Sequence, residues 1–156
     1  MTGTTDGRGS TAFQVHPAGW THAFAEKSAR AFGEVFADDI VLEATVLRTP
    51  IDGRCHVMRV MGAACDVYES LVFTHEASVG DRCYLEWEGT ALGGLELSGV
   101  TVLTKDESGR IVHAAIHHRP LGAALRFSGE LRDRLAGVID RTCFYDPYER
   151  VPNGWD

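Results

Sequence analysis

The 156-residue chain has the length of one ordinary domain, and its 44% hydrophobic and 24% charged residues are typical of a globular protein. A formal net charge of −7 argues against a nucleic-acid partner, because binding to a phosphate backbone usually needs a basic face. No apolar run approaches the ~20 residues that span a bilayer, so no membrane partner is expected.

Residues 1–11 contain neither a basic start nor an apolar stretch, so they are predicted to be a disordered tail and not a signal peptide. The four cysteines, Cys55, Cys65, Cys83 and Cys143, lie far apart and form no Cys-x-x-Cys pair. They are interpreted as small buried hydrophobic residues. A cytoplasmic location, in which thiols stay reduced, is expected.

Residues 16–37 carry apolar side chains at helical spacing, which predicts helical structure. Ser28 lies in the middle of this segment and is typical of an N-cap, so two short helices that meet at an angle are expected. The chain then continues as a β-branched strand over residues 40–47. After a Pro-Gly turn, residues 54–70 predict a third helix.

Strands dominate the next part of the chain. Alternating apolar residues and intervening turn signals predict four strands, over residues 72–78, 83–90, 95–105 and 111–118. Pro120 cannot donate to a ladder hydrogen bond, so the last strand is expected to end before it.

The C-terminal part is expected to be a helix followed by an aromatic tail. Apolar residues at helical spacing predict an amphipathic helix over residues 121–135. Residues 12–140 are thus interpreted as one domain. Residues 141–156 carry Phe144, Tyr145, Tyr148 and Trp155, so this tail is predicted to pack on the body or on a partner subunit.

The order of elements predicts an α+β fold, because helices that precede a run of antiparallel strands segregate to one side of the sheet. We expect a cone-shaped, curved antiparallel sheet with helices packed on its concave side. The inner face of such a sheet is a natural pocket for a small molecule.

Four segments carry a family resemblance: residues 35–43 (VFADDIVLE), 50–54 (PIDGR), 109–112 (GRIV) and 118–121 (HRPL). Together with their spacing they make residues 20–135 similar to the nuclear transport factor 2-like (cystatin-like) superfamily. The chain most resembles its SnoaL-like branch of polyketide cyclases and the related ketosteroid isomerases. The resemblance implies the cone fold and a homodimer that forms through the outer face of the sheet. It does not specify a reaction, because this superfamily hosts isomerases, cyclases, dehydratases, epoxide hydrolases and proteins without chemistry.

Ketosteroid isomerases use an Asp as general base, and a Tyr and a protonated Asp as oxyanion donors. When these positions are carried over by spacing from the matching segments, the tyrosine falls on Trp20, the base on Ala44 and the acid on Thr101. All three functional groups differ from those of the isomerases. Ketosteroid isomerase chemistry is therefore not expected.

Period-2 alternation of the strands predicts a mostly apolar pocket wall. The candidate ligand-binding residues are Trp20, Phe24, Ala44, Met61, Cys83, Leu85, Trp87, Leu103, Ala114 and Ile116. A register shift of one residue in the middle strand would instead turn Tyr84, Glu86 and Glu88 inward.

The candidate catalytic residues are His118, Thr101 and Glu43. His118 suits general acid–base catalysis because its ordinary pKa is near ~6.5, and the alternative is a structural histidine at a strand end. Thr101 is expected on the same wall. Glu43 is a candidate base if a bulge turns it inward. His113 and His117 would lie about 13 Å apart on one face, too far for one metal ion, so no metal site is expected.

Two functions remain open. The first is a cofactor-free cyclase, isomerase or dehydratase that acts on an apolar polyketide- or steroid-like substrate. The second is a non-catalytic ligand-binding or assembly module on the same fold. A third, structural reading is a dimer whose cavity is filled by Trp20, Phe24 and Trp87.

Overall fold

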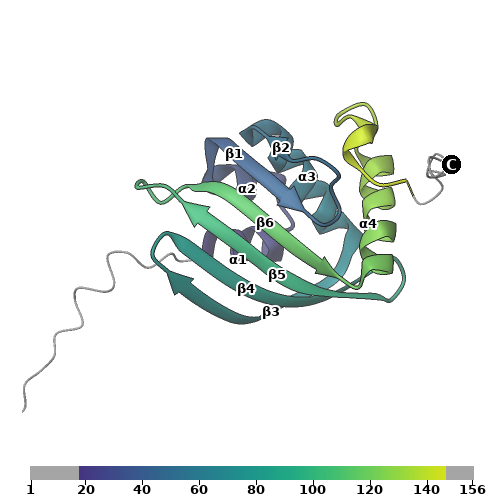
Figure 1. Ribbon diagram of the computed structural model, residues 1–156, viewed down its shortest axis with the longest axis horizontal. Coiled ribbons are helices and arrows are strands. Elements are labelled where there is room, and N and C mark those ends of the chain that lie inside the picture. Colours follow the sequence, from purple (N-terminus) through teal and green to yellow (C-terminus); the bar gives the residue numbers. More distant parts are fainter. Residues whose placement is uncertain (1–17, 147–156) are drawn as a thin grey trace, which may run out of the picture.

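Two short helices, α1 (Ala18–Glu26) and α2 (Ala29–Val35), begin the part of the chain that the computed structural model describes, residues 18–146 (Figure 1). The predicted N-cap is confirmed, because Ser28 is extended and its hydroxyl accepts a hydrogen bond from the Ala31 N–H at 3.2 Å. The helices meet through the rings of Trp20, Phe24 and Phe32, whose centroids lie 5.0–5.5 Å apart in edge-to-face arrangements.

One sheet follows, in the order β2-β1-β6-β5-β4-β3. Its strands are β1 (Phe36–Ala44), β2 (Ile51–Asp52), β3 (Tyr68–Val79), β4 (Arg82–Ala91), β5 (Leu95–Lys105) and β6 (Ile111–Arg119). The expected strands are all present, and the α+β class is confirmed. Two of them begin four residues earlier than predicted, because each strand starts where the preceding helix ends.

The sheet is mixed, which corrects the expectation of a wholly antiparallel one. β1 pairs with β6 in parallel, with Leu42 opposite Ala114 and Ala44 opposite Ile116, whereas the other neighbours run antiparallel. Parallel neighbours need a long crossover connection. Here the crossover consists of α3 and four strands, β2 to β5, and no local signal in the sequence specifies it.

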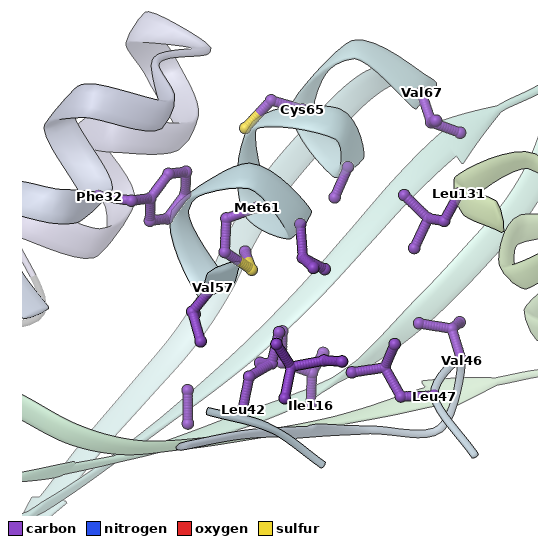
Figure 2. Packing of buried hydrophobic residues seen from close by; sticks show 14 of the residues in the cluster. Phe32, Leu42, Val46, Leu47, Val57, Met61, Cys65, Val67, Ile116 and Leu131 are labelled. Atoms are coloured by element: carbon purple, nitrogen blue, oxygen red, sulfur yellow. The ribbon is translucent and has the colours of Figure 1, made fainter. Parts of the chain in front are cut away.

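Helix α3 (Arg54–Val67) lies on the inner face of the sheet, and α4 (Leu121–Arg134) stands across its end (Figure 1). Figure 2 shows Val57 and Met61 of α3 pointing towards Leu42 and Ile116 of the sheet, while Leu131 of α4 lies near Val46 and Leu47. Full burial of one such side chain contributes about 1.5–3 kcal/mol. The core therefore lies between the sheet and its helices.

Residues 141–146 pack on the body through a short helical turn, η3 (Arg141–Cys143). Phe144 is fully buried and forms a β-bridge with Leu47. The buried hydroxyl of Ser128 donates to the Val46 carbonyl at 2.6 Å and accepts from the Tyr145 N–H at 2.9 Å. These bonds join α4, the loop after β1 and the C-terminal segment.

Two predicted segments lie outside the described residues: the tail of residues 1–11, and the end of the C-terminal tail with Tyr148 and Trp155. Among the helices of residues 18–146, none has the length and apolar character that crossing a membrane requires.

Candidate functional site

A small cavity lies under the inner face of the sheet, between α1 and strands β3 to β6. Its volume of about 20 Å³ is enough for one water-sized group. Its lining is mostly aromatic and aliphatic and consists of Phe24, Tyr68, Leu71, Phe73, Trp87, Thr101, Ile116 and His118.

The strand register brings Trp87 and His118 together across β5. Alternation along β4 buries Cys83, Leu85 and Trp87 and exposes Tyr84, Glu86 and Glu88, so the predicted register is confirmed. Pairing then aligns Trp87, Gly99 and His118 in one row of the sheet. The rings of Trp87 and His118 meet at a centroid distance of 5.3 Å, nearly perpendicular to each other.

Gly99 makes this contact possible. A Cβ atom at this position would lie 2.0 Å from the His117 carbonyl oxygen and 2.7 Å from the Trp87 ring. Such distances are far inside van der Waals contact, so any side chain would displace the ring or the backbone. Sequence reasoning missed Gly99, although a glycine inside a strand is a known sign of close approach by a neighbouring group.

Two lining residues have a buried ring nitrogen without a hydrogen-bond partner among the described residues: Nε1 of Trp87 and Nδ1 of His118. An unpaired buried polar group costs about 1–3 kcal/mol, so native structures rarely keep two in one place without a use. The hydroxyl-bearing side chain of Thr101 is 2% exposed and lines the same cavity. The cavity thus combines an apolar wall with four side chains that carry a polar group, those of Tyr68, Trp87, Thr101 and His118.

The lining carries no charge at neutral pH. Burial is the main cause that lowers the pKa of His118; a contact with the Ile116 backbone opposes the shift, the neighbouring His117 adds to it, and the resulting pKa is about 4. The imidazole is therefore neutral and can donate one hydrogen bond and accept another. Burial also raises the pKa of Tyr68 far above its ordinary value, so its phenol stays protonated.

Five of the predicted site residues line the cavity: Phe24, Trp87, Thr101, Ile116 and His118. The others do not. Trp20, Met61, Cys83, Leu85, Leu103 and Ala114 are buried in the core, and Ala44 packs at its edge. The helices fill most of the inner face with their own side chains, which leaves space only towards β3. The roles of the five residues in binding or catalysis stay predictions.

Trp20 illustrates the difference most clearly. It was expected to close the mouth of the pocket, but its ring packs against Phe32 and Phe36 at 5.2 and 6.3 Å. It also contacts Phe24, which does line the cavity. Trp20 therefore supports the cavity wall from behind.

Glu43 does not point inward, which corrects its place as a candidate base in the pocket. The irregularity of β1 lies between Phe36 and Val41, so alternation is regular from Val41 onward and turns Glu43 outward. Its Oε2 lies 2.8 Å from Nε2 of His113 on the exposed side of the sheet.

Three lining residues were missed by the sequence reasoning: Tyr68, Leu71 and Phe73. Tyr68 continues the apolar stripe of α3 and was assigned to that helix, but α3 ends at Val67 and Tyr68 is its C-cap. The signal was present in the alternation of residues 71 and 73 on the edge strand.

Within residues 18–146, no three His, Cys, Asp or Glu side chains gather in an arrangement suited to a metal ion.

Solved structures share this fold along most of the chain. An uncharacterized protein with a cystatin-like fold from Silicibacter pomeroyi is 19% identical, with a TM-score of 0.72, covering 81% of this chain and 91% of that one. A steroid delta-isomerase from Pseudomonas aeruginosa is 23% identical, with a TM-score of 0.71, covering 76% and 88%. A protein with a ketosteroid isomerase-like fold from Catenulispora acidiphila, in complex with trimethylamine, is 19% identical, with a TM-score of 0.58, covering 72% and 90%. At these identities the likeness establishes the fold.

A comparison with curated proteins finds no match. The family profile described as "SnoaL-like domain" matches residues 18–114, well over half of the chain. This range includes both N-terminal helices, α3 and the strands as far as Ala114, which carry most of the cavity lining. The chain therefore belongs to the SnoaL-like domain family and has the nuclear transport factor 2-like fold that the resemblance implied.

Proposed function

We propose that this protein binds a small, uncharged, largely apolar organic molecule and that His118 and Trp87 hold the polar group of that molecule. The observation that carries the proposal is that two neighbouring residues of the cavity lining, Trp87 and His118, each have a buried ring nitrogen, Nε1 and Nδ1, without a hydrogen-bond partner among the described residues. A buried polar group that is unpaired in the free protein gains the most from a ligand that pairs it.

The chemistry that suits this arrangement is a cofactor-free proton transfer, as in an isomerase, a cyclase or a dehydratase. The Trp87 N–H would donate a hydrogen bond to a carbonyl or hydroxyl oxygen. Neutral His118 would take a proton from the substrate and, once protonated, return it to another atom of the same molecule, with Thr101 beside it. A positioned acid–base group typically contributes a rate enhancement of ~10²–10⁴-fold. The aromatic lining and the fold shared with a steroid delta-isomerase support a polyketide- or steroid-like substrate, of which only a polar group would enter the small cavity.

Ligand binding without turnover is the second candidate, and a specific observation favours it. No carboxylate lines the cavity, and the three positions that correspond to the acid–base groups of ketosteroid isomerases hold Trp20, Ala44 and Thr101. A histidine whose pKa is held near 4 is also a weak base at neutral pH.

Native mass spectrometry of the purified protein is the first experiment, followed by incubation of the captured molecule with wild type, His118→Gln and the control His117→Gln. His117 neighbours His118 but is exposed on the outer face of the sheet. The enzyme hypothesis is supported if wild type and His117→Gln convert the molecule and the rate of conversion falls at least ~10²-fold in His118→Gln. Retention without conversion would support the binding module. Unchanged retention and conversion in His118→Gln would contradict both assignments of His118.

The outer face of the sheet supports a further part of the proposal, a homodimer. Val72 and Tyr84 are 60% and 37% exposed there, and a second copy that packs on this face would cover both side chains. We expect two copies by light scattering and dissociation in Tyr84→Glu. A wild-type monomer at micromolar concentration would refute this part alone.

A further inference from the structure

A surface groove of about 310 Å³ between α1 and β3 lies directly outside the cavity. The two spaces share four lining residues: Phe24, Tyr68, Leu71 and Phe73. One layer of side chains therefore separates a space for a single oxygen atom from a groove of the size that small molecules occupy.

This layer belongs to the least constrained part of the sheet. β3 is the edge strand, and its pairing with β4 shifts register between Tyr68 and Ser70 and again between Phe73 and His75. The two irregularities bracket Leu71 and Phe73, which are only half-buried. Bulged edge segments with few buried contacts open at lower free energy than a central strand does.

Phe73 is the side chain of the layer that can move most easily. Phe24 is fixed by edge-to-face contacts with Trp20 and Phe32, at 5.5 and 5.0 Å. Tyr68 is buried and packs on Phe127 at 4.8 Å. Phe73 makes a ring contact with Phe24 at 5.8 Å and lies between the two register shifts.

The charges of the groove are already engaged by the fold. Lys27 Nζ donates to the Tyr68 carbonyl at 3.3 Å. Glu69 Oε1 accepts from the N–H groups of Gly93 and Gly94 at 2.8 and 2.9 Å. The groove lining thus carries one positive and one negative side chain and no net charge, and the cavity behind offers no charge either, which favours an uncharged molecule.

We propose that the groove and the cavity form one two-part binding site gated by Phe73. The ligand places a single carbonyl or hydroxyl oxygen between Trp87 and His118, and its apolar body lies in the groove against Phe24 and Leu71. Rotation of the Phe73 ring joins the two spaces. The inner half of this site rests on the proposed function, whereas the gate and the outer half are additional.

The test uses acetophenone as an uncharged probe and benzoate as a charged probe of similar size. The readout is the indole N–H signal of Trp87 in ¹H–¹⁵N NMR spectra, assigned by its loss in Trp87→Phe. Phe73→Ala opens the gate, and Val79→Ala is the matched control, since Val79 is on the same strand, 71% exposed and away from both spaces. A third variant, Ala25→Trp, fills the groove from the exposed side of α1.

We expect acetophenone, and not benzoate, to shift the Trp87 signal. A closed gate leaves ~10% or less of the molecules competent to bind, so Phe73→Ala should accelerate association by about tenfold or more, with Val79→Ala like wild type. Ala25→Trp should weaken binding without unfolding the protein. This variant keeps the test valid if Phe73→Ala does not fold.

The remaining outcomes separate the two proposals. If acetophenone shifts the Trp87 signal equally fast in wild type and Phe73→Ala, and equally strongly in Ala25→Trp, the gate and groove are wrong and the cavity site stands. An equal response to benzoate refutes the uncharged class. If neither probe shifts the signal in wild type or in Phe73→Ala, the proposed function fails together with the gate.

Discussion

His118 makes the stability of this protein depend on pH between about 4 and 6.5. Burial lowers the pKa of the folded-state imidazole from 6.5 to about 4. Above pH 6.5 the ring is neutral in both the folded and the unfolded state. As the pH falls towards 4, the unfolded chain binds a proton that the folded protein excludes, so the free energy of unfolding decreases. Below pH 4 both states are protonated and the loss is complete.

The size of the loss follows from the two pKa values. A tenfold difference in proton affinity corresponds to about 1.4 kcal/mol, so the complete loss is about 3 kcal/mol. At pH 4.5, where the folded ring is still mostly neutral, about 2.5 kcal/mol is lost. This is a large part of the 5–15 kcal/mol that is typical of a domain.

Urea denaturation at pH 7 and pH 4.5 measures this loss, and comparison with His118→Gln isolates it because glutamine does not titrate. We expect wild type to lose about 2.5 kcal/mol more than His118→Gln between the two pH values. The control, His117→Gln, should keep most of the wild-type loss, because His117 is the smallest of the causes that shift the pKa of His118. Equal losses in wild type and His118→Gln, or an NMR titration of the His118 ring near pH 6.5, would refute the reasoning.

Three other substitutions test the packing around the site. In thermal denaturation, Gly99→Ala should destabilise the fold by about 1–3 kcal/mol, because its Cβ meets the His117 carbonyl and the Trp87 ring. The same substitution should shift the Trp87 indole signal. The control Gly122→Ala, with open space around it in α4, should be neutral or stabilising. Ser128→Ala should cost about 1–3 kcal/mol in urea denaturation, because two backbone groups lose their partner; a cost no larger than that of exposed Ser70→Ala would contradict this. Glu43→Gln should change stability by at most about 0.5 kcal/mol and leave probe binding intact, since its ion pair is exposed; weaker acetophenone binding would restore Glu43 to the site.

Much of the fold could be predicted from local patterns. Helical spacing identified α1 to α4, a serine at the right position identified the N-cap of α2, and alternation identified which side of β4 faces inward. These signals come from neighbouring residues on one element, so they are visible in one sequence. The parallel pairing of β1 and β6 is not visible in one sequence, because it depends on where a long crossover ends.

The cavity was harder to predict than the fold for the same reason. Alternation gave the inward set correctly, but the volume left inside depends on how deeply the α1, α2 and α3 side chains fill the sheet. Trp20 and Met61 therefore became core residues. Tyr68 was missed because its apolar side chain continues the helical stripe one residue beyond the end of α3. Gly99 was missed because its role is visible only when its neighbours across the sheet are known.

The parallel pairing of the first strand with the last long strand has a consequence for biosynthesis. β1 leaves the ribosome early, with the apolar side chains of Ile40 and Leu42 already displayed, but its neighbour β6 is synthesised only after α3 and four further strands. Contacts between distant parts of a chain form slowly, since a long loop must close first. During translation β1 is therefore an exposed apolar segment, the kind of sequence that chaperones bind, until residue 119 has left the exit tunnel.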